Sequence, residues 1–303
     1  MKREIKPLAL FTICPLRLFA LSSRISAFGK IVLIFLLASL NVQAWFLLPA
    51  AAAPGREKVL EALKYQADIW VLTDAARARV TFTRLGQGRY RAEVAAEAQG
   101  LAKLLSGQRM DNYATEMVVC HGLLVPLVYR EESRRWGKYH LKEYRFDYEK
   151  GRLELWQHQE GQGLVRKWEA ALTEEPIYDP LSAFYNFRLG ALGRPRAGES
   201  LRLRGIPYPR PEEIVIQIGQ REKQGRKVMV SLINRVFNDE GVVVFIFFDK
   251  HWTPSQGWSQ ILSFGKVAGQ ILPGSKPLNG SLPEMHSGLK SSRCRVPGSK
   301  SGE

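Results

Sequence analysis

The sequence predicts a mainly β, β-rich α+β domain in which a curved antiparallel sheet or half-barrel packs on one mostly apolar helix. Three observations lead to this prediction. Apolar residues alternate at period two through most of residues 65–272, turns recur at short intervals, and only one segment has a convincing helical pattern. Such alternation is typical of antiparallel strands that bury one face.

The alternation is clearest in three stretches. Apolar side chains occupy every second position in residues 90–96, in residues 214–218 and, after a turn, in residues 228–232. Successive side chains of a strand point to opposite faces, so each stretch has one buried face. From Tyr139 onward the apolar frame shifts by one position, which predicts a β-bulge near Lys142.

The segment Val242–Phe248 is apolar at every position, so both faces of this strand must be covered. The expected cover is a helix that begins at Asp179 and Pro180, because aspartate caps a helix N-terminus well and proline suits the first helical position. Apolar side chains then occupy most of the surface of this helix, so it is expected to be buried.

The N-terminal region predicts export. A basic segment ends at Lys30, an apolar run follows over residues 31–48, and Val42 and Ala44 occupy the −3 and −1 positions of a cleavage site. The run is also long enough to remain as an inner-membrane anchor, and that alternative stays open. Residues 1–53 are therefore interpreted as a signal peptide or N-terminal anchor with its flank.

The remaining chain divides into a β-rich periplasmic domain over residues 60–272 and a tail over residues 273–303. The tail is rich in Ser, Gly, Pro and Lys and has no periodicity, so it is expected to be disordered. Cys120 ends an apolar run and is expected to be a buried thiol, although a disulfide with Cys294 is another possibility.

The charge distribution argues against a nucleic-acid partner. Of the net charge of +15, residues 1–30 contribute +5 and residues 265–303 contribute +4, which leaves +6 for the body. A body charge of this size fits solubility or weak attraction to anionic envelope surfaces. The five histidines are scattered without metal-ligand spacing, so neither a metal nor a cofactor is predicted.

The sequence contains no convincing catalytic motif, and we predict no catalytic residues. An acid–base pair would need carboxylates that converge from distant strands. The candidates are Asp147, Glu154, Asp179 and Asp249. Each also has a simpler structural explanation, such as helix capping for Asp179, so a glycan or peptide hydrolase is the least favoured function.

Several short segments follow one another in a recognisable order. They are Lys64-Tyr65, Ala95 to Leu101, Leu124-Val125-Pro126 with Tyr129-Arg130, Phe146-Asp147-Tyr148, Asp179 to Tyr185, and Phe248-Asp249 before Thr253-Pro254. In this order, from Tyr65 to Leu272, the chain resembles domain-of-unknown-function family 3108, a set of predicted periplasmic proteins of Gram-negative bacteria. The resemblance implies an exported location and a β-rich fold, and it implies no activity.

Two groups of residues are candidates for binding. The first group lies where the helix is expected to face the strand that it covers: Phe184, Tyr185, Phe187, Phe245 and Phe247. Aromatic side chains of this kind could line a site for a lipid or another apolar or amphipathic envelope molecule. Their alternative role is to fill the core.

The second candidate group is a basic and aromatic stretch formed by Arg134, Arg135, Trp136 and Lys138. Cations and rings together suit an anionic glycan or a lipid headgroup, whereas a solvated hairpin turn needs no ligand.

We therefore expect an exported, non-enzymatic periplasmic protein whose partner is a lipid or an envelope glycolipid. The alternative is an envelope protein-interaction or assembly module that binds another envelope protein. The membrane is expected to be contacted only through the signal or anchor.

Overall fold

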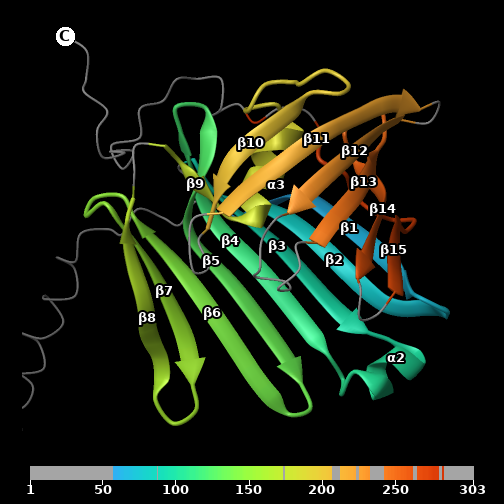
Figure 1. Cartoon of the computed structure of the whole chain (residues 1–303), viewed down its shortest axis with the longest axis horizontal. Helices are drawn as coiled ribbons and strands as arrows, with labels where there is room; N and C mark the ends of the chain where they lie inside the picture. The colour runs from blue at the N-terminus through green and yellow to red at the C-terminus, as the bar shows by residue number, and fades with distance from the viewer. Residues whose placement is uncertain are drawn as a thin grey trace, which may run out of the picture. The chain divides into compact units, whose positions relative to one another are not determined.

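The computed structural model describes residues 57–86, 88–172, 175–206, 212–222, 225–232, 242–261, 265–279 and 282. Their strands form one large sheet that does not close into a barrel (Figure 1). The expected mainly β fold is confirmed. Residues 1–53, the predicted signal or anchor, lie outside the described residues.

The elements follow the chain in this order: β1 (Lys58–Ile69), β2 (Leu72–Gly86), β3 (Arg89–Ala98), α2 (Gly100–Leu105), β4 (Met110–Cys120), β5 (Leu123–Arg135), β6 (Lys138–Asp147), β7 (Arg152–Gln159), β8 (Gly163–Ala171), β9 (Ile177–Tyr178), α3 (Pro180–Leu189), β10 (Ser200–Gly205), β11 (Glu212–Glu222), β12 (Gly225–Leu232), β13 (Val242–Phe248), β14 (Pro254–Ile261) and β15 (Gly265–Ile271).

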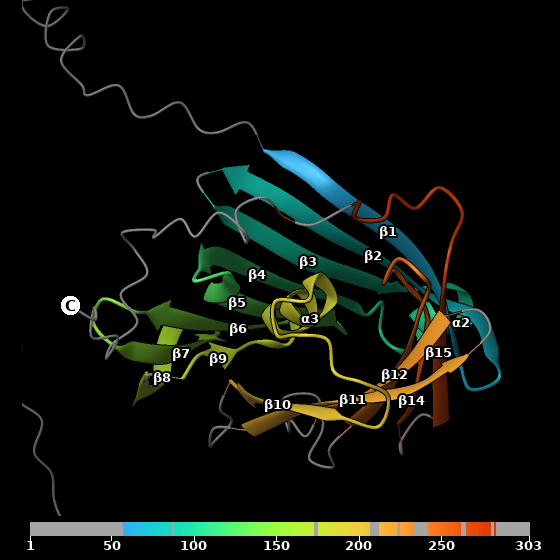
Figure 2. The same cartoon turned by 90° about the horizontal axis from the view of Figure 1, so that it is seen from above.

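The chain enters the sheet in its middle. Strands β1 to β8 run outward as antiparallel neighbours, and the next strand, β9, lies at the opposite edge, with α3 between β9 and β10 in the chain. From there β9 to β15 run back, and β15 pairs with β1. Among the strands of the described residues, only β9 and β10 pair in parallel. Figure 2 shows α3 between the β3–β6 region and the β10–β12 region of this sheet.

Helix α3 begins where the sequence predicts. One carboxylate oxygen of Asp179 accepts hydrogen bonds from the backbone N–H groups of Leu181, at 2.8 Å, and Ser182, at 3.1 Å. The Ser182 hydroxyl in turn accepts from the Asp179 N–H, which completes a capping box. Pro180 fills the first helical position, where no N–H is needed. At the other end, Gly190 has φ of 80° and terminates the helix.

The description of this helix as mostly apolar needs correction. Its buried residues include Ser182, Asn186 and Arg188 beside three apolar ones. The Asn186 amide accepts a hydrogen bond from the Leu124 N–H at 2.8 Å and donates one to the Leu124 carbonyl at 2.7 Å. The side chain thereby satisfies both backbone groups of a β5 residue, as a neighbouring strand would do.

Two apolar clusters contact α3 from different parts of the sheet. In one, the Tyr185 ring stacks on the Phe82 ring with centroids 4.2 Å apart. In the other, the Phe187 and Phe248 rings meet edge to face at 6.1 Å. The alternation predicted for residues 90–96 and 214–218 is confirmed by the burial of Tyr90, Ala92 and the three isoleucines.

The predicted β-bulge near Lys142 is absent. Strand β6 pairs with β5 and β7 in a continuous register through this residue. Tyr139 and Leu141 therefore lie on the face opposite to Tyr144 and Phe146, because side chains alternate along an unbroken strand. The apolar residues of β6 change from odd to even positions because they lie on one face in the first half of the strand and on the other face in the second half. The register does not change.

The ordered chain continues past β15. Lys276 and Ala62 exchange backbone hydrogen bonds of 2.7 and 2.8 Å, and the Leu278 N–H donates to the Glu61 carboxylate. Leu282 is only 3% exposed and belongs to the core. The expectation of disorder is therefore wrong for residues 273–279 and for Leu282, while residues 283–303 lie outside the described part of the chain.

Cys120 is buried and disulfide-bonded, so the prediction of a free thiol is wrong. Its partner cysteine lies outside the described residues. Within the described ranges no helix is long and apolar enough to span a membrane.

Candidate functional site

The structure brings together the three aromatic residues predicted on α3. Tyr185 and Phe187 are at most 1% exposed. Phe184 is half-buried, and its ring lies 5.3 Å from the Tyr185 ring and 6.2 Å from the Phe248 ring. These rings fill the space between helix and sheet by contacting one another, which is how a packed core is built.

Phe245 and Phe247 do not face the helix as predicted. Their neighbours Ile246 and Phe248 pack in the cluster that holds Phe187. Because β13 alternates, Phe245 points the other way, where it stacks on Trp258 with ring centroids 4.0 Å apart. A strand that is apolar at every position contains no signal for which alternate set faces inward.

A fully buried ion pair links α3 to β1. The Arg188 guanidinium donates to the Glu61 carboxylate and to the Trp252 carbonyl, and both charged side chains are at most 3% exposed. The Tyr185 hydroxyl donates to the same carboxylate at 2.9 Å. Burial, followed by the Glu61 charge, raises the pKa of Tyr185, so this hydroxyl stays protonated. The network satisfies buried polar groups and holds the helix in place.

A hollow of about 520 Å³ lies over β1–β5. Its lining comes mainly from two adjacent rows of cross-strand partners. The first row is Lys64, Arg79, Ala95, Asn112 and Glu132. The second row is Arg77, Glu97, Met110 and Arg134. We call this hollow the outer basin, because Tyr113, which follows Asn112, packs into the core on the opposite face.

The outer basin combines a small apolar floor with a basic rim. Ala95 leaves its centre open, and Met110 and Leu272 add apolar surface. Arg77 and Arg134 have acidic neighbours, Asp74 at 2.6 Å and Glu132 at 3.5 Å. Lys64 and Arg79, in contrast, have no ion pair with any described residue. Glu97 is an acidic lining residue that likewise has none, so the lining keeps a small excess of positive charge.

The predicted basic and aromatic stretch is divided by the structure. Arg134 lines the outer basin and lies 5.1 Å above the Tyr139 ring. Arg135, Trp136 and Lys138 are exposed at the turn between β5 and β6. The stretch is therefore a solvated hairpin turn with one arginine in a pocket.

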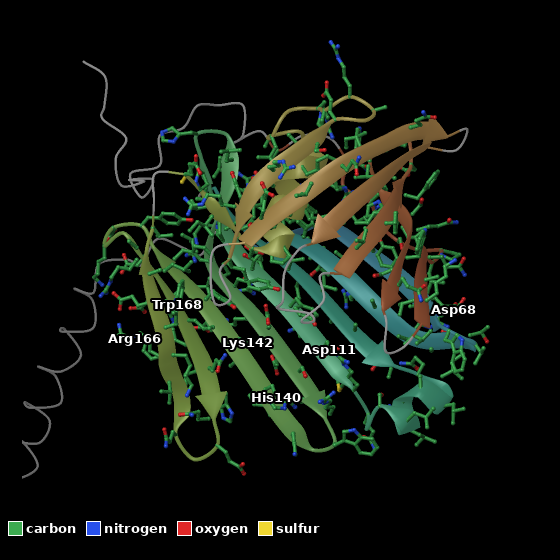
Figure 3. The ribbon with its side chains drawn as sticks, in the orientation of Figure 1. Asp68, Asp111, His140, Lys142, Arg166 and Trp168 are labelled. Atoms are coloured by element: carbon green, nitrogen blue, oxygen red, sulfur yellow. The ribbon has the colours of Figure 1, made fainter. Side chains whose placement is uncertain are left out.

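The opposite, inner face of the sheet carries a row of polar residues beyond the N-terminus of α3. Tyr113, Glu131, Lys142 and Gln157 are successive cross-strand partners. The Lys142 ammonium lies 3.5 Å from one Glu131 oxygen. Figure 3 labels Lys142, with Asp111 and His140 of the next row, on the lower halves of β4 and β6.

Burial raises the pKa of Glu131 from its ordinary value of 4.5 to about 7, and the Lys142 ammonium only partly opposes this shift. A carboxyl whose folded pKa is raised stabilises the fold below its unfolded pKa and loses that contribution as the pH rises through its folded pKa. We expect the unfolding free energy of the wild type, relative to Glu131→Gln, to fall between about pH 4.5 and pH 7. Urea denaturation across this window measures the difference, and a constant difference would contradict the assignment.

The four candidate carboxylates do not converge into an acid–base pair. Asp179 caps α3, and one Asp249 oxygen accepts from the N–H groups of His251 and Thr253 in a turn. Glu154 lies on the outer face with Arg166, at 3.2 Å, and Asp147 pairs with the nearby Lys150. Among the described residues, no group of three or more His, Cys, Asp or Glu could hold a metal ion.

The comparisons with known proteins decide the family. The family model described as Protein of unknown function (DUF3108) matches residues 64–230, which is more than half of the chain. The chain belongs to this family. The resemblance noted in the sequence is thereby confirmed. The matched range includes α3 and every residue that lines the outer basin except Leu272.

Two further comparisons add less. A search of curated proteins finds no match to this DUF3108 protein. Among solved structures it is similar to a β-barrel-like protein of the domain of unknown function DUF1849 from Brucella abortus, at 9% identity and a TM-score of 0.44. That match covers 71% of this chain and 96% of the other.

The outer basin and the Glu61–Arg188 pair were not predicted from the sequence. Arg188 lies 127 positions from Glu61, and each reads separately as an ordinary charged residue. In this DUF3108 protein, the one available signal for the basin was the small-residue segment Ala95 to Leu101, whose first residues, Ala95 and Ala96, line it.

Proposed function

We propose that this DUF3108 protein is an exported, non-enzymatic protein of the bacterial envelope that binds an amphipathic anion in the outer basin. The observation that supports this most strongly is the pairing of an apolar floor with the cations Lys64 and Arg79, which have no ion pair with a described residue. An acyl chain or similar apolar group would cover the floor, and its anionic head would lie beside these cations. An acidic lipid or an envelope glycolipid has this chemistry.

The volume of the outer basin supports a ligand of limited size. At about 520 Å³, it falls within the range of ordinary small-molecule pockets. It accommodates part of a lipid, such as a headgroup with the start of a chain. The space between α3 and the sheet is a less suitable place for the ligand, because Tyr185, Phe187 and Phe248 are buried against one another there.

The envelope location is supported by the basic segment that ends at Lys30 and by the apolar run over residues 31–48. Both lie outside the described residues. An anionic lipid partner is consistent with this location, because exported proteins meet the lipids and glycolipids of the envelope directly.

Dihexanoyl phosphatidylglycerol, titrated as a monomer, tests this proposal. We expect the full chain to bind it, and reversal of both rim charges by Lys64→Glu with Arg79→Glu to weaken binding at least about tenfold. Ala95→Phe should weaken binding as strongly by filling the floor. Ala95 is exposed on the outer face, so its replacement adds nothing to the core. Calorimetry measures each affinity.

Lys58→Glu is the matched control, because Lys58 is exposed on the same strand as Lys64 and lies outside the basin. It should leave affinity within about twofold. Equal affinities for the wild type and for both basin variants would contradict the proposal. The same affinity for dihexanoyl phosphatidylcholine would remove the requirement for an anion.

A protein-interaction module is the second candidate function. Strand β8 ends the sheet order, so one side of its backbone has no strand neighbour among the described residues. Such an edge can accept an extended segment of another envelope protein. A partner that binds there would be unaffected by Ala95→Phe, which separates this function from ligand binding in the basin.

A further inference from the structure

Large exposed apolar side chains are concentrated at one end of the sheet. The set consists of Trp70, Val71, Leu101, Leu104, Leu105 and Trp136. They come from three neighbouring connections: the turn between β1 and β2, helix α2, and the turn between β5 and β6. Their exposures range from 57% for Leu101 to 75% for Trp70. We call these six residues the apolar tip.

The three connections form one continuous surface. Helix α2 lies against β2, and the Gln99 N–H before it donates to the Ala75 carbonyl. After α2, the Trp136 N–H donates to the Gly107 carbonyl at 2.8 Å. A Cβ at Gly107 would clash with the Trp136 ring, so the indole rests on this glycine. Figure 1 shows α2 beside the ends of the neighbouring strands.

The hairpin turn holds Trp136 in a costly conformation. Trp136 and Gly137 connect Arg135 to Lys138, which are cross-strand partners, and both turn residues have positive φ. Such two-residue turns favour Asn, Asp or Gly at the first position. A tryptophan at φ of 53° is strained, yet its side chain remains 66% exposed. The contact with Gly107 leaves most of the indole exposed, and the turn geometry does not favour tryptophan at this position.

The charges around the apolar tip favour an anionic partner. Lys103, Arg135 and Lys138 are exposed beside it. Asp111 is paired with Arg109 at 2.7 Å, whereas Asp68, two residues before Trp70, has no ion pair with a described residue. Three exposed cations thus outnumber the one carboxylate without a cation beside the exposed tryptophan and leucine. This combination is typical of segments that lie in the interface of a bilayer with anionic lipids.

We propose that the apolar tip docks on the surface of an anionic lipid bilayer. The leucines of α2 would enter the boundary of the acyl chains, the two indoles would lie at headgroup level, and the cations would contact lipid phosphates. The three connections of the apolar tip protrude separately, and a fluid bilayer can adapt to such a surface. From the sequence, membrane contact was expected only through a signal or anchor, and the tip adds a second contact. No residue of the outer basin takes part, so this proposal is independent of the proposed function.

The test uses the full chain with vesicles of phosphatidylglycerol and phosphatidylethanolamine that carry brominated acyl chains. Bromine quenches tryptophans that reach the membrane. We expect Trp70→Phe with Trp136→Phe to remove most of the quenching that the wild type shows. Leu104→Asp with Leu105→Asp should weaken vesicle binding at least about tenfold. Val59→Asp is the control, because Val59 is 44% exposed and lies far from the tip along β1. It should leave binding unchanged.

The remaining outcomes each overturn the proposal. If the apolar run over residues 31–48 alone held the chain on vesicles, Trp45 would be quenched, and the Trp70 and Trp136 variants would be quenched as much as the wild type. Equal binding to neutral phosphatidylcholine vesicles would exclude an anionic surface as the partner. Failure to bind any vesicle, together with tip-dependent self-association, would show that the tip binds protein.

Discussion

Arg188→Met is expected to lower the free energy of unfolding by about 3–5 kcal/mol. The substitution leaves the Glu61 carboxylate buried, at 0% exposure, without its cation. Removing one partner of a buried ion pair is costly because the remaining charge is desolvated and uncompensated. The Trp252 carbonyl would lose its guanidinium donor as well. Urea denaturation followed by circular dichroism measures the loss.

A double variant identifies the cause of this loss. In Glu61→Gln with Arg188→Met, no buried charge remains, and the glutamine oxygen can still accept from the Tyr185 hydroxyl. The double variant should therefore be more stable than Arg188→Met alone, because replacing both members of a buried pair is far less costly than breaking it. If the two substitutions destabilised the protein additively, packing and not charge would explain the effect of Arg188.

Phe187→Ala is expected to lower the free energy of unfolding by about 3–5 kcal/mol, through lost burial and through the cavity that remains. Phe187 is 1% exposed and contacts the rings of Phe248 and Trp252. Phe184→Ala should be less destabilising, because Phe184 is only half-buried. Thermal and urea denaturation of both variants measure this order.

The Phe187 result separates a packed core from a ligand cavity at α3. The wall of an empty cavity has fewer packing partners, so a small loss for Phe187→Ala would point to a cavity. Recovery of stability on addition of lipid to wild type but not to the variant would do the same. Either result would move the binding site from the outer basin back to the helix.

Most of the fold could be predicted from local patterns. Residues 90–96 and 214–218 alternate because one face of each strand is buried, and this signal is present in the sequence itself. The start of α3 could be predicted equally well, since Asp179 and Pro180 satisfy the requirements of a first turn without any long-range contact. Local chemistry fixes these features.

Long-range pairing explains what the sequence could not show. The choice between Phe245 and Phe248 as the helix contact depends on the register of β13 with its neighbours, and every position of that strand is apolar. The C-terminal residues Leu278 and Leu282 lie in a segment with a disordered composition, yet β1 and the core hold them. Composition alone could not reveal those contacts.

The outer basin could not be predicted from the sequence, for a related reason. Lys64, Arg79 and Glu132 each look like solvent-exposed positions of a one-sided strand. They become neighbours only through the cross-strand register of five strands, with Ala95 between them. A site made from the outer faces of several strands has no contiguous motif, so sequence inspection favoured the aromatic helix instead.

Backbone amide chemical-shift mapping with dihexanoyl phosphatidylglycerol locates the bound lipid on the protein. Binding in the outer basin should give the largest shifts at Ala95, Asn112 and their neighbours there, and these shifts should disappear in the Lys64→Glu, Arg79→Glu variant. Amides of α3 should move little, because the helix is enclosed by core rings and by the Glu61–Arg188 pair. Large shifts along Pro180–Leu189 with unchanged amides in the basin would place the lipid at the helix and overturn binding in the outer basin.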